Sequence, residues 1–127
     1  MNGKRYFFDT NAIVALLKGH TEIVALANEA DFIAISIISR LEFFAFSSLT
    51  QADKDLFNRF VDRVTVIDLA MHNPLLLDAI SEIRTQSSLK LPDAIVAASA
   101  KSVNATLVTA DIKLANYTKE SAYLFKP

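Results

Sequence analysis

The sequence of 127 residues contains no cysteine. This absence excludes disulfide frameworks, thiolate nucleophiles and cysteine-ligated zinc sites, and it fits a reducing compartment. No stretch approaches the roughly 20 consecutive apolar residues that a membrane-spanning helix needs. The apolar start of the chain is interrupted by Asp9 and Asn11, which is not typical of a signal peptide. We therefore expect a cytoplasmic protein without a membrane segment.

Glycine is almost as scarce, since Gly3 and Gly19 are the only two in the sequence. The phosphate-binding loops of dinucleotide-binding enzymes and P-loop NTPases need several clustered glycines, so both classes are excluded. The two histidines, His20 and His72, lie at predicted helix starts. Surface or capping polarity is the simplest role for both of them.

A basic excess is also absent, because the net charge is −1. The total charge by itself does not indicate a nucleic-acid partner. Hydrophobic residues make up 52% of the chain, which is sufficient for a packed core. The length suits one domain, and we assign residues 1–127 to it.

Short apolar strands alternate with helical patterns along the whole chain. The strands are predicted at residues 6–8, 32–38, 64–68, 105–109 and 123–125. The helices are predicted at residues 10–17, 21–30, 39–48, 50–63, 73–86 and 93–103, with a short one near Lys113. This order predicts an α/β domain in which a central, mostly parallel sheet is flanked by helices on both faces.

Three acidic residues come directly after predicted strands. Asp9 and Asp111 end strands, and Glu42 lies in the first turn of the helix that follows strand 32–38. The carboxyl ends of parallel strands share one edge of the sheet, where ligands bind in such folds. Asp93 opens a helix that leads into a strand, so topology alone does not place it at this edge.

Each of these acids also has a simple structural explanation. Asp9, Asp93 and Asp111 suit helix N-caps, and the run from Ser39 to Glu42 matches a capping box. As a group, however, they would repel one another, by about 4 kcal/mol for a close pair at an effective dielectric near 20. Bound cations or shared protons would relieve this repulsion. Oxygen ligands without histidine or cysteine favour Mg²⁺ or Mn²⁺.

Four runs of sequence resemble the acidic motifs of PIN domains, and above all those of VapC-like toxins from prokaryotic toxin–antitoxin pairs. The resemblance covers essentially the whole chain and implies a three-layer PIN-like fold, with Asp93 beside the other three acids. The runs are Phe7-Phe8-Asp9-Thr10-Asn11, Ser39-Arg40-Leu41-Glu42, Leu91-Pro92-Asp93-Ala94-Ile95-Val96-Ala97-Ala98-Ser99-Ala100 and Leu107-Val108-Thr109-Ala110-Asp111.

The resemblance implies an Mg²⁺-dependent endoribonuclease, with Mn²⁺ as a substitute, that hydrolyses RNA phosphodiester bonds. It would be the toxin of a toxin–antitoxin pair, a homodimer kept silent by a cognate antitoxin protein. Asp9 and Asp93 would hold the main metal, and Glu42 would bind metal or orient the attacking water. Asp111 would complete a second or water-mediated site. If these four acids form one metal-binding site, 13 positive and 10 negative charges remain on the rest of the chain.

Several neighbours of the acids are candidates for supporting roles. Thr10, Asn11 and Thr109 could orient the carboxylates as a second shell of hydrogen bonds, although turn and cap chemistry would also explain them. Arg40 and Lys90 lie beside two of the acids in sequence. They could contact RNA phosphate or simply be solvated surface charges.

Other functions remain open at this point. A haloacid dehalogenase-like phosphatase would use Asp9 as nucleophile, but Asn11 stands where its second acid is usual. A receiver domain is disfavoured because its acidic pair and its phosphorylated aspartate occupy different strands from the acids of this sequence. The remaining alternatives are a PIN-like RNA-processing nuclease without an antitoxin and a catalytically inactive PIN-like protein-interaction module.

The predicted helix 39–48 is apolar nearly all round. Leu41, Phe44 and Ala45 form one stripe, whereas Phe43 and Phe46 point elsewhere. One face of a helix suffices for its own sheet. The second face is therefore expected to meet helix 50–63, a second copy of the chain, or an antitoxin.

Overall fold

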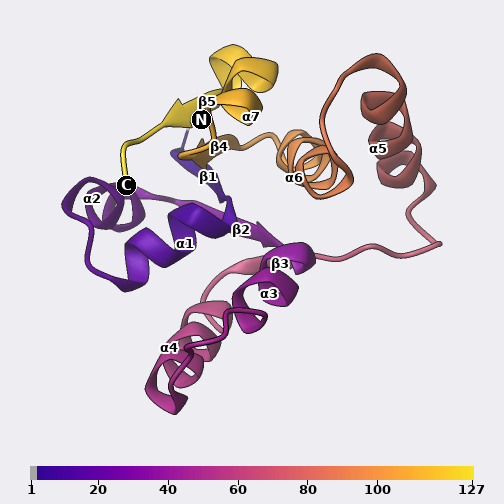
Figure 1. Ribbon diagram of the computed structural model, residues 1–127. Helices are drawn as coiled ribbons and strands as arrows, with labels where there is room; N and C mark the ends of the chain where they lie inside the picture. Colours follow the sequence, from indigo (N-terminus) through magenta and orange to yellow (C-terminus); the bar gives the residue numbers. More distant parts are fainter. Residues whose placement is uncertain (1–2) are drawn as a thin grey trace.

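The computed structural model describes residues 3–127, and residues 1 and 2 of the assigned domain 1–127 lie outside this part. Its centre is a five-stranded, fully parallel sheet in the order β3-β2-β1-β4-β5 (Figure 1). The strands are β1 (Arg5–Phe8), β2 (Phe32–Ser36), β3 (Thr65–Ile67), β4 (Thr106–Thr109) and β5 (Ala122–Leu124). The predicted α/β class with a mostly parallel sheet is confirmed.

Helices cover both faces of the sheet and complete three layers (Figure 1). They are α1 (Thr10–Leu17), α2 (Thr21–Glu29), α3 (Ile37–Phe44), α4 (Gln51–Val61), α5 (Pro74–Gln86), α6 (Leu91–Ser102) and α7 (Ile112–Thr118), followed by the 3₁₀ turn η1 (Lys119–Ser121). Within residues 3–127, none of them combines the length and hydrophobicity that a membrane crossing requires.

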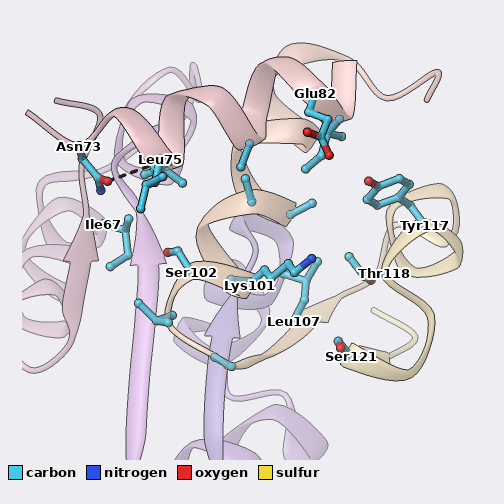
Figure 2. A pocket seen from close by; sticks show the side chains of 18 of the residues that line it. Ile67, Asn73, Leu75, Glu82, Lys101, Ser102, Leu107, Tyr117, Thr118 and Ser121 are labelled. Atoms are coloured by element: carbon cyan, nitrogen blue, oxygen red, sulfur yellow. Dashed lines mark hydrogen bonds between the residues drawn. The ribbon is translucent and has the colours of Figure 1, made fainter. Parts of the chain in front are cut away.

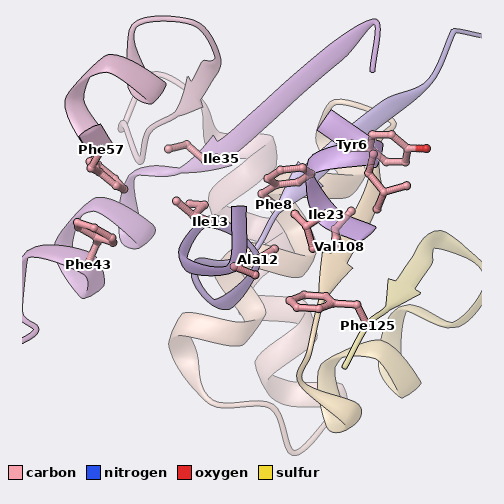
Figure 3. Packing of buried hydrophobic residues seen from close by; sticks show 12 residues of the cluster. Tyr6, Phe8, Ala12, Ile13, Ile23, Ile35, Phe43, Phe57, Val108 and Phe125 are labelled. Carbon is pink, nitrogen blue, oxygen red and sulfur yellow. The ribbon is translucent and has the colours of Figure 1, made fainter. Parts of the chain in front are cut away.

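The central strand β1 has buried side chains on both of its faces. Phe8 packs with Ile13, Ile23 and other residues of the α1 and α2 layer (Figure 3), whereas Phe7 packs with Val96 of α6. Successive side chains of a strand point to opposite faces, so adjacent phenylalanines enter different cores. Burial on both faces explains why the strands are continuous apolar runs instead of alternating ones.

The chain enters α3 earlier than predicted, and strand 32–38 and helix 39–48 are corrected accordingly. The strand ends at Ser36, whose buried hydroxyl accepts a 3.1 Å hydrogen bond from the Ile38 amide and caps the helix. Ile37 and Ile38 read as strand residues by propensity, but this N-cap starts the helix before them. The helix ends at Phe44, and its C-cap is Ala45.

Helix α4 packs against α3 through Phe57. Phe57 stacks on Phe43 with ring centroids 4.4 Å apart, and Phe44 meets the same ring edge-on at 5.4 Å. Of the partners expected for the second face of this helix, helix 50–63 is the one observed, since Phe43 and Phe44 both pack against α4. Leu41 and Phe46 remain exposed, at 59% and 46%.

Helix α6 begins at Leu91 and not at Asp93 as predicted. Pro92 occupies its first turn, where the fixed φ of proline is already helical and its missing amide has no partner to lose. Its small residues Ala94, Ala97 and Ala98 are buried, which lets the helix lie close to its neighbours. Asp93 therefore lies in the first turn and is not the N-cap, a position that Lys90 takes. Most other boundaries differ from the predicted ones by one or two residues.

Candidate active site

Asp9 follows β1 directly and is 7% exposed. Its Oδ1 accepts a 2.8 Å hydrogen bond from the Thr10 amide, which caps α1. Its Oδ2 accepts a 2.7 Å bond from the Thr109 hydroxyl and a longer one, 3.3 Å, from the side-chain Nδ2 of Asn11. Residues from both β1 and β4 therefore hold this carboxylate in one orientation.

The buried position of Asp9 changes its acidity. Burial is the main cause that raises its pKa to about 6, and the negative charges of Glu42 and Asp93 raise it further. Hydrogen bonds from Thr109 and Thr10 act in the opposite direction by stabilising the carboxylate. Burial and like charges outweigh those bonds, so the free protein holds Asp9 at an electrostatic cost.

Glu42 projects from α3 toward the start of α1. Its Oε1 accepts a 2.5 Å bond from the Thr10 hydroxyl, which lies 2.9 Å from the Ser39 hydroxyl. Thr10 has one hydroxyl proton and Glu42 can only accept, so Ser39 donates to Thr10. The predicted capping box from Ser39 to Glu42 is wrong, because Ser36 caps this helix and Glu42 is bonded across to α1.

Asp93 joins the same group of acids. Burial is the first cause that raises its pKa, followed by the charges of Asp111 and Glu42, whereas Lys113 and Lys90 lower it. In α/β folds a helix that leads into a parallel strand starts near the carboxyl edge of the sheet, because it runs back along the sheet before the strand. The first turn of α6 thus brings Asp93 within electrostatic range of the acids that follow strands.

Asp111 is the N-cap of α7 and accepts a 3.1 Å bond from the Leu114 amide. Its own amide donates to the Thr109 hydroxyl at 3.0 Å, and that hydroxyl donates in turn to Asp9. Asn11 reinforces the link, because its Oδ1 accepts a bond from the Ala110 amide. One buried threonine thus ties the first acid to the segment that carries the last.

These carboxylates are spread apart and do not form a closed cluster. Among residues 3–127, no three acidic or histidine side chains come close enough together to enclose a metal ion. In the same part of the chain, the one salt bridge joins Lys4 to Glu29, so no basic side chain neutralises the acids directly. Mg²⁺ keeps several waters and is commonly bound through one or two carboxylates. The donor set therefore fits a hydrated hard cation.

The basic residues differ in their surroundings. Arg40 is exposed, and its guanidinium carbon lies 4.7 Å from the centre of the Phe44 ring. Lys90 is exposed and acts electrostatically on Asp93. The sequence analysis did not select Lys113, which acts on Asp93 as well. Its position two residues after Asp111, on the exposed side of a helical first turn, is the signal that was available.

An apolar cavity lies away from the acids. It has a volume of about 850 Å³ and is bounded by α5, α6 and the segment around Tyr117 (Figure 2). Its walls are largely aliphatic, and Glu82 and Lys101 are its charged residues. None of the four predicted site acids lines it.

Comparisons with known proteins agree with this fold. Residues 6–120 match the family model of the PIN domain. A toxin–antitoxin complex from Klebsiella pneumoniae aligns with a TM-score of 0.75 and 23% identity, over 94% of this chain and 99% of the other. VapBC2 from Rickettsia felis, bound to a DNA fragment from its promoter, aligns with a TM-score of 0.74 and 23% identity, over 95% and 98%. FitAcB from Neisseria gonorrhoeae aligns with a TM-score of 0.66 and 17% identity, over 93% and 96%. No curated protein matches the sequence.

Proposed function

We propose that this chain, which belongs to the PIN domain family, is a Mg²⁺-dependent endoribonuclease that cleaves RNA phosphodiester bonds. The observation that carries the proposal is the buried Asp9 carboxylate, which lies among the charges of Glu42 and Asp93 and has no basic partner within residues 3–127. A fold that keeps such a group at a cost is typical of a functional site. The like charges would be relieved by a divalent cation.

Asp9 and Asp93 are the residues that would hold the main ion, Mg²⁺ or Mn²⁺ in its place. Glu42 would bind metal or orient water, and Asp111 would complete a second or water-mediated site. When bound, the cation would lower the pKa of a coordinated water and offset the negative charge of the phosphodiester.

The protein's own contribution is orientation. Thr109 and Asn11 fix one oxygen of Asp9. The Thr10 hydroxyl, itself bonded to the Ser39 hydroxyl, fixes Oε1 of Glu42. The second oxygen of Glu42, Oε2, is left to accept a hydrogen bond from water. Hydrolysis adds this water across one P–O bond, and the proton that the water loses ends on the departing oxygen. A carboxylate held by hydroxyl groups needs little rearrangement during this transfer.

We further propose that the protein is a cytoplasmic VapC-like toxin that forms a homodimer and is inhibited by a cognate antitoxin. The support is the fold shared with the toxin–antitoxin complexes described above. The exposed Leu41 and Phe46 of the α3 region offer apolar surface to a protein partner. Such surface suits an amphipathic helix, which inhibitory segments commonly use.

Metal binding is tested by melting the purified wild-type protein with EDTA and with millimolar Mn²⁺. A cation that binds only the folded protein raises the melting temperature. We expect a higher melting temperature in Mn²⁺, a smaller shift for Asp9→Asn, and cleavage of single-stranded RNA that stops in EDTA and resumes with excess Mg²⁺. Identical melting curves and cleavage that persists in EDTA would refute the metal site.

A further inference from the structure

Two lysines flank the Asp93 side of the acid cluster. Lys90 immediately precedes α6, and Lys113 lies in the first turn of α7, two residues after Asp111. The segments are distant in sequence, but α6 and α7 contact each other in the fold. Both lysines are exposed, and both act electrostatically on Asp93. Positive charge therefore gathers on one rim of a strongly acidic edge.

No side chain of residues 3–127 forms a direct ion pair with either lysine. In the described residues 3–127, the only salt bridge is that between Lys4 and Glu29. Lys113 Nζ donates one hydrogen bond, of 3.1 Å, to the carbonyl oxygen of Ser88. An ammonium group carries three donors, so two remain available to an anion. The bond also holds Lys113 over the loop that ends at Lys90.

The third basic residue near the acids is placed differently. The Arg40 guanidinium lies over the Phe44 ring, a cation–π arrangement that its own helix supplies. Arg40 is also not among the groups that influence Asp93. The cations that act on Asp93 therefore lie on the α6 and α7 side of the acids, whereas Arg40 is held against its own helix.

We propose that Lys113, with Lys90 beside it, binds a backbone phosphate next to the scissile linkage of single-stranded RNA. This inference rests on the proposed ribonuclease function and adds to it the side of the site on which the strand is held. An anionic strand that enters an acidic edge needs compensating charge, and exposed lysines supply it to phosphates. The contact positions the strand and carries no information about the bases.

The test compares Lys113→Gln with Lys113→Arg in steady-state cleavage of a short single-stranded RNA. Glutamine keeps a donor for the Ser88 carbonyl but loses the charge, whereas arginine keeps the charge. We expect Lys113→Gln to raise KM by roughly tenfold, the effect of one lost charged hydrogen bond. We expect kcat to change little, and Lys113→Arg to stay near wild type. Lys101→Gln, at the distant cavity, is the matched control and should leave both constants unchanged.

Salt dependence gives a second measurement. In the Asp93→Asn background without metal, binding of fluorescent RNA should show a slope against log salt that falls by about 0.7 when Lys113 becomes glutamine. Melting curves establish that each variant is folded. If Lys113→Gln lowers kcat and leaves KM and the salt slope unchanged, Lys113 only positions the α6 loop and the proposal is overturned.

A methylphosphonate scan locates the contacted phosphate. Neutralising the right linkage should weaken binding by wild type as much as Lys113→Gln does, and combining the two changes should add nothing further. If the loss of binding from Lys113→Gln adds to the loss from the methylphosphonate at every linkage, Lys113 does not contact a phosphate directly. Failure of the underlying function is recognised separately: if Asp93→Asn cleaves at the wild-type rate, the ribonuclease assignment fails whatever Lys113 does.

Discussion

At the scale of single residues, Asp9 connects stability to pH. Its pKa of about 6 in the folded protein lies above the ordinary value of about 3.9. A carboxyl that holds its proton more tightly when folded contributes stability below pH 4, and this contribution is lost as the pH rises through 6. Two pKa units correspond to about 3 kcal/mol.

Asp9→Asn does not titrate, so in EDTA its free energy of unfolding should rise relative to wild type between pH 4 and pH 7. The maximum relative gain is about 3 kcal/mol, measured by urea denaturation at each pH. Only the change of this free-energy difference with pH is compared, so any constant effect of the new asparagine side chain cancels. A difference between the two proteins that does not vary with pH would contradict a strained Asp9.

Thr109 is the residue whose hydroxyl bridges Asp9 and the Asp111 amide. Thr109→Val keeps the shape of the side chain and removes the hydroxyl, which is itself fully buried. We expect cleavage to fall by about 10- to 100-fold, as for other lost supporting bonds in metal sites. The acid limb of the pH–rate profile should also move to higher pH, because a bond that lowers the Asp9 pKa is gone. Loss of activity without such a displacement would indicate a packing defect instead.

At the scale of elements, the start of α3 decides where Glu42 points. Ser36 caps this helix, and Ser39 lies one turn further on, beside Thr10. Ser36→Ala should lower the free energy of unfolding by about 1 kcal/mol, the usual cost of a lost N-cap. Ser39→Ala is the companion variant. If urea denaturation shows a loss of about 1 kcal/mol for Ser39→Ala and no loss for Ser36→Ala, the assignment of Ser36 as the N-cap is incorrect.

Sequence patterns predicted the elements better than the contacts between them. The alternation of apolar runs and amphipathic helices located all five strands and the parallel class. The start of α3 was misplaced because Ile37 and Ile38 favour a strand locally, while the Ser36 cap and packing against α4 favour a helix. The Glu42–Thr10 bond crosses 32 residues, and no local pattern encodes it.

At the candidate site, too, sequence patterns predicted the position of residues within elements but not the contacts between elements. Acids after strands could be assigned to one edge from topology, but Asp93 required the resemblance to a family. Lys113 was missed because its effect on Asp93 depends on the packing of α6 against α7. Long-range electrostatics of this kind follow from the assembled layers and not from spacing along the chain.

At the scale of the whole molecule, we predict that the wild-type chain is toxic when expressed alone. Growth should arrest, and the arrest should be relieved by co-expression of a small protein encoded beside the gene or by Asp9→Asn. The purified protein should be a dimer by light scattering, since α3 leaves apolar surface exposed. Harmless expression of a monomeric protein that still cleaves RNA would remove the toxin proposal and leave the nuclease proposal intact.

The most direct test of the central claim is cleavage of single-stranded RNA in Mg²⁺ by three proteins purified in parallel. They are wild type, Asp93→Asn, and Asp78→Asn on the exposed surface of α5. A shared contaminating nuclease would act equally in all three preparations. We predict cleavage by wild type and Asp78→Asn and none by folded Asp93→Asn. Equal cleavage by Asp93→Asn and wild type would contradict the claim that these carboxylates perform the reaction.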